Sequence, residues 1–411
     1  MATTPPLSGA DSKTGNEAGG RPLDGIRVVS LEQALAGPLC SRHLADLGAE
    51  VIKIERPGGG DLARRYDTSV KGLSSYFVWL NRNKRSLTLD LKRPAAVAVL
   101  EQLIGGADVF VQNLAPGAID RLGLGLSTLR ERYPALVICS ISGYGRGGPY
   151  EHRKAFDLLL QGETGVMATT GTAELMVKAG ISVGDIGAGV YGALATVAAL
   201  YERQTTGQGR LVETSLFDAL AEWMGYPVAF TQYGGEPPAR ACDRHATVVP
   251  YGLYRCGDGL SINLAVQSEE HWHRFCAVVC EHPEWEDDPR FASASGRRTH
   301  RDVLETAIES AFAAHPRVEI TRRLDATGIP YGDVRSVAGF IEHPQLRARG
   351  RWQAVDTPAG PIEAIVPGFD LEDMEPRMEA VPDIGEQTDA ILAELGYDEK
   401  AIEQLRKDGI A

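Results

Sequence analysis

The sequence predicts an α/β fold in which a large, doubly wound parallel sheet is joined to a smaller α+β domain. Short apolar runs alternate with helical stretches from residue 23 onwards, which is the pattern of βαβ units with right-handed crossovers. After about residue 224 the chain becomes rich in Gly, Pro and aromatic residues. With 411 residues the chain is long enough for two domains with separate cores.

The elements of the large domain follow one another along the chain. The first βαβ unit has a strand at 26–31, a helix from Pro38 to Leu47 that stops at Gly48, and a strand at 51–55. Further strands are expected at 86–90, 108–113, 136–141 and 210–216, with helices at 94–104 and from Phe217. Ligands of such sheets bind beyond the carboxyl ends of the strands.

Four stretches describe the expected domain organisation. Residues 1–22, rich in Gly, Thr, Ser and Pro, are expected to be a disordered tail. Residues 23–224 form the first part of the large domain, 225–337 the small domain, and 338–411 the return to the large domain. The small domain carries a strand at 260–266 and helices at 269–280 and 299–312; the return carries a β-like stretch at 352–369 and an amphipathic helix at 389–405.

Composition narrows the classes of function. The net charge of −13 argues against a general nucleic-acid surface or an anionic membrane as the main partner. The six cysteines are scattered, and no hydrophobic signal or membrane-spanning run is present in the sequence, so we expect a cytoplasmic protein with reduced thiols.

Asp185 is the leading candidate for a catalytic group. It follows the apolar run 176–184 and precedes a stretch, 186–203, with small and apolar residues on every face. That stretch predicts a buried helix with Asp185 at its N-cap, where unpaired N–H groups and the helix dipole stabilise a carboxylate. Glycines on both sides leave room for a ligand, so Asp185 is suited to act as a nucleophile. The alternative interpretation is an Asp that only caps the helix.

A dinucleotide-dependent oxidoreductase is an alternative from another class. Gly187, Gly189 and Gly192 match G-x-G-x-x-G, and Glu213 follows at a suitable spacing. The match lies inside an apolar helix rather than at the first strand-to-helix turn, which disfavours this function. His271, His273, Cys276 and Cys280 suggest a metal site, but their spacing fits an ordinary structural helix better, and no metal is expected.

Two groups of basic residues are expected at the sheet ends, where a phosphorylated ligand docks. One is the run Asn81–Arg85, and the other consists of Arg56, Arg64 and Arg65. The alternative for both groups is a solvated surface.

The chain resembles the class III CoA-transferases, the group of formyl-CoA transferase, carnitine CoA-transferase and α-methylacyl-CoA racemase. The resemblance runs from Leu23 to the C-terminus. Its marks, in order along the chain, are residues 23–29, Ala36-Gly37-Pro38, 47–57, 83–87, 113–117, Gly184-Asp185, 207–209 and 384–389.

The resemblance implies a mechanism and a binding site. Asp185 matches the aspartate that attacks an acyl-CoA thioester and passes through a mixed anhydride to an aspartyl-CoA thioester, from which an acceptor carboxylate takes the CoA. Coenzyme A is then a substrate, and no permanently bound cofactor is needed. The residues implied around the CoA adenine and phosphates are Arg56, Leu89, Asn113, Leu114, Arg121 and Lys154. An interlocked homodimer is also implied.

Two departures from the family pattern bear on the substrate. The racemase branch has a His-Asp pair where this chain has Phe156-Asp157, so a racemase-like isomerase, which needs two bases, is the less favoured alternative. The formyl-CoA branch has a Gln at the position of Leu35, and its Gly-rich run in the small domain is missing. We expect a CoA-transferase for small dicarboxylates of the succinate, itaconate, mesaconate or citramalate type, because extra positive groups are available to hold a second carboxylate. Candidates for holding the second carboxylate are Arg64, Arg65, Arg240, Arg244 and His245, with Arg244-His245 reaching the acyl pocket.

Overall fold

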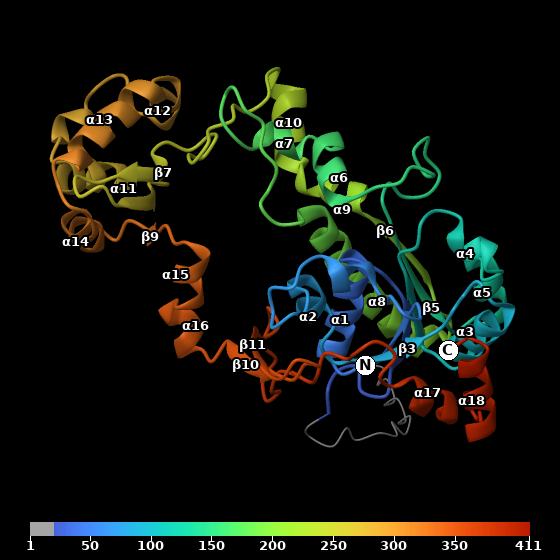
Figure 1. Cartoon of the computed structure of the whole chain (residues 1–411). Coiled ribbons are helices and arrows are strands. Elements are labelled where there is room, and N and C mark those ends of the chain that lie inside the picture. The colour runs from blue at the N-terminus through green and yellow to red at the C-terminus, as the bar shows by residue number, and fades with distance from the viewer. Residues whose placement is uncertain (1–19) are drawn as a thin grey trace, which may run out of the picture. The chain divides into compact units, whose positions relative to one another are not determined.

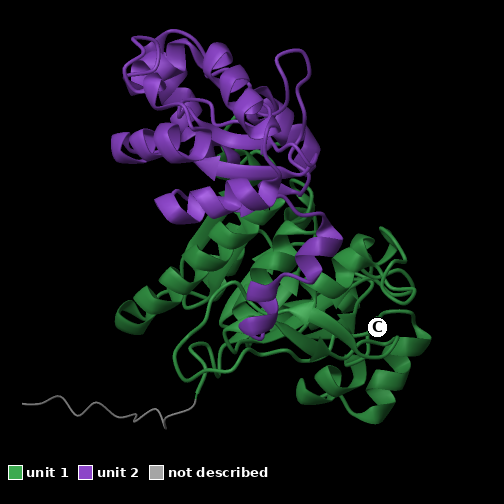
Figure 2. Ribbon diagram, turned by 90° about the vertical axis from the view of Figure 1, so that its left-hand side faces the viewer, with its two compact units in different colours: residues 1–154, 185–219, 351–411 green, residues 155–184, 220–350 purple. Residues whose placement is uncertain are grey.

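The computed structural model describes residues 20–411, so the predicted tail at 1–22 lies almost wholly outside the described residues. The chain divides into two compact units, shown in Figure 2. Unit 1 comprises residues 1–154, 185–219 and 351–411, and unit 2 comprises residues 155–184 and 220–350.

Unit 1 is built on a six-stranded sheet in the order β3-β2-β1-β4-β5-β6. Every neighbouring pair is parallel, and Val29 of β1 is in register with Ile52 of β2 and Phe110 of β4. The order therefore reverses beside β1, which is the topological switch point of a doubly wound sheet. The predicted fold class is confirmed. The strands are β1 (Arg27–Leu31), β2 (Glu50–Glu55), β3 (Lys84–Thr88), β4 (Val109–Gln112), β5 (Val137–Ser142) and β6 (Leu211–Ser215).

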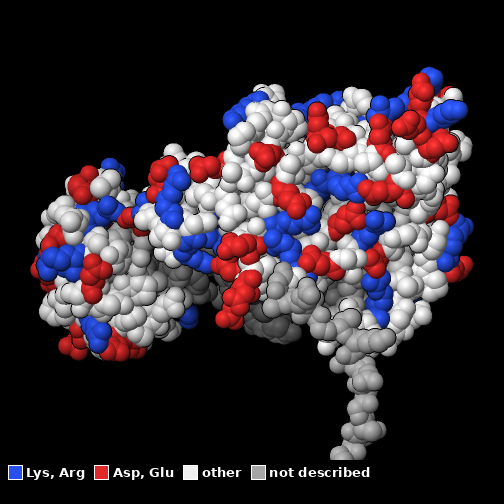
Figure 3. Space-filling model, turned by 90° about the horizontal axis from the view of Figure 1, so that it is seen from below, with Lys and Arg blue, Asp and Glu red and all other residues white. Residues whose placement is uncertain are grey.

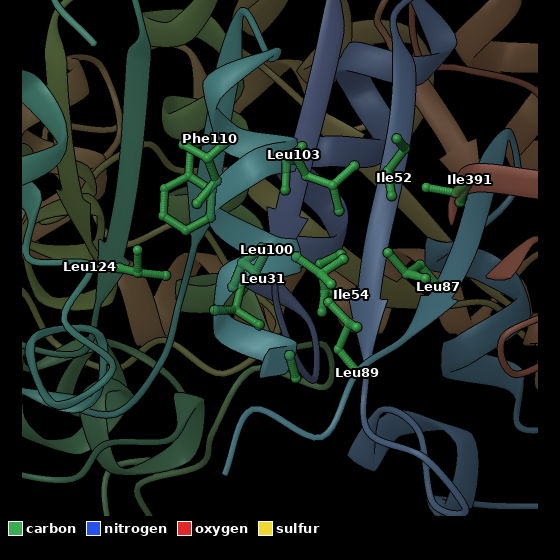
Figure 4. Close-up of a cluster of buried hydrophobic side chains, with 14 of the residues drawn as sticks. Leu31, Ile52, Ile54, Leu87, Leu89, Leu100, Leu103, Phe110, Leu124 and Ile391 are labelled. Carbon is green, nitrogen blue, oxygen red and sulfur yellow. The ribbon is translucent and has the colours of Figure 1, made fainter. Parts of the chain in front are cut away.

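Alternate residues of the strands supply the main core of unit 1 (Figure 4). Leu31, Ile54 and Phe110 point to the same face and pack against Leu100 and Leu103 of α3. The continuous apolar strands are typical of a parallel sheet that is covered on both faces. The remaining elements of unit 1 are α1 (Ala36–Asp46), η1 (Leu62–Arg65), α2 (Ser75–Leu80), α3 (Pro94–Gly105), α4 (Ala118–Arg121), α5 (Leu126–Arg132), β10 (Trp352–Val355), β11 (Ile362–Ile365), α17 (Thr388–Glu394) and α18 (Glu399–Lys407).

The second face of the sheet is covered by α1 and by α8 (Val183–Thr206). A Cβ on Gly192 of α8 would lie 3.2 Å from the Cys139 Sγ of β5 and 3.3 Å from the Cys40 Sγ of α1. By length and composition, α8 is the one described helix that is apolar enough to cross a membrane. Because it packs this closely on the sheet, we assign it as the core helix of unit 1.

Unit 2 contains a three-stranded antiparallel sheet in the order β7-β8-β9. Trp272, Phe275 and Phe312 are fully buried in its core. The expected helix at 269–280 is present, although its second half is a wider, π-type helix, η2. The elements are α6 (Asp157–Glu163), α7 (Val166–Thr169), α10 (Gly225–Gly234), β7 (Tyr251–Arg255), β8 (Ser261–Ala265), α11 (Glu269–Arg274), η2 (Phe275–Cys280), η3 (Pro283–Trp285), α12 (Ala294–Thr299), α13 (Arg301–Ala313), α14 (Arg317–Thr327), β9 (Tyr331–Asp333), α15 (Val337–Ile341) and α16 (Pro344–Ala348). Helix α9 (Leu216–Trp223) begins in unit 1.

The compact units differ from the predicted ranges in one respect. Residues 155–184 group with 220–350, and the chain returns to unit 1 at residue 351, whereas we expected an unbroken stretch at 23–224. Figure 1 shows α6 and α7 beside α10, with which they share unit 2. That the predicted ranges 23–224, 225–337 and 338–411 correspond to folding domains stays a prediction.

Candidate active site

A cavity of about 430 Å³ opens in unit 1 at the carboxyl ends of β1 to β4. Its apolar wall includes Leu31 at the end of β1 and Ile54 near the end of β2. Leu89 follows β3 directly, and Leu114 comes shortly after β4. This is the edge at which a doubly wound sheet binds its ligand. We call this cavity the switch-point pocket.

Three basic residues line the switch-point pocket, namely Arg56, Lys92 and Arg121. All three are exposed, and within residues 20–411 none of them forms an ion pair. The Arg56 Nη2 makes only a long hydrogen bond, 3.4 Å, to the Gly60 carbonyl. In a chain of net charge −13, cations that remain without carboxylate partners beside an apolar wall are suited to hold a phosphorylated ligand.

The structure brings four of the six predicted CoA residues together in this pocket. They are Arg56, Leu89, Leu114 and Arg121. Lys154 is exposed in the loop after β5 and does not line the cavity. Lys92 was missed by the sequence analysis, and the available signal was its position in the loop that follows β3.

Asn113 lies next to the pocket, but its side-chain amide is engaged elsewhere. Its Oδ1 accepts a hydrogen bond of 2.8 Å from the N–H of Gln33, and its Nδ2 donates one of 2.8 Å to the Gln33 carbonyl. The amide therefore clamps the loop that leads from β1 into α1. A role for Asn113 in contacting CoA stays a prediction.

The same loop has a second anchor at Ala34, whose φ of +63° places it in the left-handed region. Its N–H donates to the Asp61 Oδ1 at 2.9 Å. This bond helps to hold a backbone conformation that is unfavourable for a residue with a Cβ. The next residue, the predicted substrate residue Leu35, is buried and packs in one cluster with Ile186 of α8, the neighbour of Asp185.

A buried network of charges supports this loop. The Glu32 carboxylate accepts from Lys53 Nζ at 3.2 Å and Lys84 Nζ at 2.8 Å, and Lys53 also donates to Asp61 at 2.7 Å. Burial alone raises the pKa of Glu32, but the two lysines outweigh it and lower the pKa to about 2. Burial lowers the pKa of Lys84 to about 8 despite the neighbouring Glu32. Such pairing is what makes buried charges tolerable.

Asp185 is the third residue of α8, which begins at Val183. The prediction that Asp185 is the N-cap is therefore wrong, because the helix starts two residues earlier than the apolar pattern indicated. The carboxylate still belongs to the first turn, where the helix dipole stabilises it. Asp185 is partly exposed. Burial, followed by the charges of Asp61 and Asp185, raises the pKa of the Tyr66 hydroxyl, so Tyr66 lies close to both carboxylates.

Two of the glycines that matched a dinucleotide fingerprint, Gly189 and Gly192, allow close packing of α8. A Cβ on Gly189 would lie 2.8 Å from the Ala36 carbonyl oxygen of α1. Gly187, Gly189 and Gly192 all lie inside α8 rather than in a turn at a strand end. They therefore do not form a phosphate-binding loop.

In unit 2, a chain of hydrogen bonds holds the segment that leads into α8. The Asp157 Oδ1 accepts from the N–H of Gly184 at 2.7 Å, and its Oδ2 accepts from the Gln161 Nε2 at 2.6 Å. The Gln161 Oε1 in turn accepts from the N–H of Ala179 at 2.8 Å. Asp157 thus satisfies a backbone N–H in the first turn of α8. Its neighbour, the predicted substrate residue Phe156, is exposed.

A second cavity of about 430 Å³, entirely within unit 2, is lined by Arg244 and His245. The Arg244 guanidinium is paired with Glu305 and Glu309, each at 2.7 Å, and lies over the Tyr254 ring. The His245 Nδ1 accepts from the N–H groups of Thr247 and Val248. The proton of the neutral ring is therefore on Nε2.

Two of the other predicted carboxylate-binding residues also have protein partners. Arg64 Nη2 pairs with Glu55 at 2.6 Å, and Arg240 donates to the carbonyls of Thr172 and Ala173. Arg65 is exposed and has no ion pair within residues 20–411.

The prediction that the run Asn81–Arg85 docks a phosphorylated ligand is wrong. β3 starts at Lys84, so the run lies at the amino end of that strand rather than at its carboxyl end. Arg82 pairs with the buried Asp46 at 2.9 Å, and Arg85 pairs with Glu50 and Glu394. These cations therefore have a structural role. The ion pairs join segments that are far apart in the sequence.

The four residues suspected of metal binding are used in other ways. Cys276 and Cys280 are buried there, and His273 pairs with Glu286 at 2.8 Å. Within residues 20–411, no cluster of His, Cys, Asp and Glu side chains has an arrangement that could hold a metal ion.

Surface charges of both signs are interspersed on the face of the molecule shown in Figure 3. Lys and Arg side chains alternate there with Asp and Glu side chains. The switch-point pocket differs, because its exposed cations have no acidic partner among the described residues.

Comparisons with known proteins identify the family of the chain. Residues 23–388 match CoA-transferase family III. The chain is 32% identical to the succinyl-CoA:glutarate CoA-transferase of Mus musculus, with 95% of this chain and 90% of the relative covered. It is 31% identical to the formyl-CoA:oxalate CoA-transferase of Rhodopseudomonas palustris, with 94% and 96% covered.

A solved structure gives the same result for the fold. The crystal structure of a CAIB/BAIF family protein from Brucella suis superposes with a TM-score of 0.80 at 31% identity, covering 92% of this chain and 100% of that one. The family match spans the switch-point pocket as well as Asp185. The chain therefore belongs to CoA-transferase family III and is a class III CoA-transferase.

Proposed function

We propose that the enzyme moves CoA between small dicarboxylic acids by way of an aspartyl-CoA thioester on Asp185. The switch-point pocket carries the proposal for the CoA end of the substrate. Its apolar wall suits the adenine ring, and Arg56, Lys92 and Arg121 suit the phosphates because charge-assisted hydrogen bonds to phosphate oxygens are strong. CoA enters as a substrate, and no permanently bound cofactor takes part.

The proposed chemistry begins with attack of the Asp185 carboxylate on the carbonyl carbon of the donor thioester. The C–S bond breaks, and CoA leaves as a thiolate while a mixed anhydride forms. The thiolate then attacks the aspartyl carbonyl and expels the donor acid. The acceptor carboxylate attacks the aspartyl thioester, and the released CoA thiolate takes the acyl group from the second anhydride. Asp185 is regenerated as a carboxylate, so each step exchanges one leaving group for another.

The partly exposed position of Asp185 in the first turn of α8 supports its role as the nucleophile. Backbone N–H groups near the attacked carbonyl suit the stabilisation of the developing oxyanions. Proton exchange at the substrate Cα requires a second base, and Phe156 stands where the racemase branch has an imidazole. We therefore propose transfer rather than racemisation.

The dicarboxylate class rests on two supports. The names of the relatives given above include succinyl-CoA, glutarate and oxalate, and His245 lines a cavity of unit 2. Of the candidates for the second carboxylate, Arg65 and His245 remain after Arg64, Arg240 and Arg244 are assigned to protein partners. An activity screen with succinyl-CoA and a panel of acids tests the proposal. Product from dicarboxylates is expected, and product from monocarboxylates alone would refute this substrate class.

We also propose that the enzyme works as a cytoplasmic homodimer. One face of α8 exposes Val190 at 43%, Leu194 at 63% and Tyr201 at 80%. Their spacing places them in one apolar stripe on a helix that is otherwise a core element. Light scattering on the purified enzyme is expected to give twice the chain mass. A monomer at working concentration would contradict the dimer without affecting the proposed chemistry.

A further inference from the structure

The chain of hydrogen bonds in front of α8 has a fixed direction. Ala179 and Gly184 contribute backbone N–H groups, which can only donate. The Gln161 side chain must therefore turn its oxygen toward Ala179, and its NH₂ group faces Asp157. Both oxygens of Asp157 receive a donor, one from Gln161 and one from Gly184. Each oxygen of Asp157 therefore acts as an acceptor in this chain of hydrogen bonds.

The surroundings leave this arrangement little freedom. Gln161 is fully buried, and it lies one helical turn after Asp157 on α6, so the two side chains share a face. A Cβ on Gly184 would lie 3.1 Å from the Asp157 Oδ1 and 3.1 Å from the Leu220 Cδ1. A side chain at position 184 would therefore crowd both the carboxylate and Leu220.

We infer that Asp157 and Gln161 are positioning residues for Asp185. Gly184 is the second residue of α8 and Asp185 is the third, so the bond from Gly184 to Asp157 fixes the turn from which the Asp185 carboxylate projects. The inference rests on the proposed role of Asp185 as the nucleophile. Neither positioning residue needs to touch the substrate.

The direction of the hydrogen bonds predicts a specific pattern of loss and rescue. Asp157→Asn sets the new NH₂ group against the NH₂ group of Gln161. Gln161→Glu sets two carboxylates against each other. The double variant Asp157→Asn/Gln161→Glu restores the three hydrogen bonds described above, because the new amide at position 157 can donate to the new carboxylate at position 161. That carboxylate can still accept from the N–H of Ala179. The double variant also has the charge of the wild type.

The test measures kcat and KM for the donor acyl-CoA in the three variants of the full-length enzyme. We expect each single variant to lose about 10- to 100-fold in kcat, since small misplacements of a reacting group have effects of this size, with KM for the acyl-CoA unchanged. The double variant should recover to within about fivefold of wild type on the same scale. Glu222→Gln, which removes an exposed carboxylate from α9 in the same unit, is the control and should match wild type.

Two results would overturn the inference. One is wild-type kcat in Asp157→Asn, and the other is a double variant no more active than the single variants. Thermal unfolding distinguishes this role from a general loss of folding. If the single variants are inactive because they unfold, their Tm falls, and the double variant recovers Tm together with kcat. Failure of the proposed function itself is recognised separately, because the wild-type enzyme would then form no hydroxylamine-trapped adduct on Asp185.

Discussion

The Lys84 Nζ lies 2.8 Å from the Glu32 Oε1, and neither side chain is exposed to solvent. Lys53 joins the same carboxylate from the neighbouring strand. Glu32 belongs to the loop that leads from β1 to Leu35. Leu35 in turn packs in one cluster with Ile186 of α8. The shape of the proposed active site therefore depends on buried charges that are mutually compensated.

Glu32→Gln is expected to destabilise the enzyme by about 3–5 kcal/mol, because two buried ammonium groups lose their shared partner. The double variant Glu32→Gln/Lys84→Met should be more stable than the sum of the single effects, since Lys53 keeps Asp61 as its partner. Urea unfolding of the four proteins of this cycle measures the coupling. Additive losses would mean that the two side chains do not interact.

The partly buried His43 predicts a pH-dependent stability. Burial, together with the charges of Arg42, Arg82 and Lys84, lowers its pKa to about 3. The unfolded chain therefore binds a proton that the folded protein excludes between pH 6.5 and about 3. The free energy of unfolding should rise with pH across this window, by at most about 1.4 kcal/mol per pH unit from this group.

The measurement is urea unfolding at several pH values with His43→Gln as the comparison. The variant should show a shallower slope from about pH 4 up to 6.5, the ordinary pKa of a histidine in the unfolded chain. Glu32 remains in both proteins, and its stabilisation is lost only as pH falls below its unfolded value toward about 2. Identical slopes in the two proteins would contradict the assignment to His43.

The switch-point pocket predicts weaker CoA binding when its cations are removed. Arg56→Gln, Lys92→Gln and Arg121→Gln should each raise the KM for acyl-CoA by about tenfold, which corresponds to one charge-assisted hydrogen bond. The loss should shrink in high salt, because exposed charges are screened. Arg130→Gln, an exposed cation on α5 outside the pocket, should leave KM unchanged. Equal KM values for all four variants would contradict a role of the switch-point pocket in CoA binding.

The glycines of α8 give a prediction about packing. Gly189→Ala would bring a methyl group within 2.8 Å of the Ala36 carbonyl oxygen, so we expect a destabilisation of about 1–3 kcal/mol. Gly225→Ala is the control, because nothing lies within 4 Å of its Cβ position at the start of α10. Thermal unfolding distinguishes the two. A neutral Gly189→Ala would contradict the close approach of α1 and α8.

The parts of the fold that the sequence predicted are those with a local cause. Parallel strands buried on both faces are continuous apolar runs, so β1, β2 and β5 were found close to their observed bounds. Arg56 was expected at this edge because residues that follow parallel strands meet there, whereas Leu114 was implied only by the resemblance to the family. The Gly184-Asp185 pair was noticed from the local apolar pattern, although it lies in the first turn of α8, which begins at Val183.

The parts that were missed depend on partners far away in the sequence. The run Asn81–Arg85 has the composition of a surface, but Asp46 and Glu32 draw Arg82 and Lys84 into the interior. Asn113 has the position of a ligand contact, yet its amide is engaged by Gln33, eighty residues earlier. Residues 155–184 belong to unit 2, but their composition does not differ from that of the flanking segments in a way that would predict this.

The most direct test of the central claim is to trap the enzyme-bound thioester. The enzyme is mixed with succinyl-CoA and hydroxylamine, digested, and analysed by mass spectrometry. Hydroxylamine attacks an aspartyl thioester and releases CoA, leaving a hydroxamate on the side chain that was acylated. We predict a hydroxamate on Asp185 and on no other carboxylate, with none in Asp185→Asn. Continued CoA transfer without modification of Asp185, or a hydroxamate on another residue, would contradict the account.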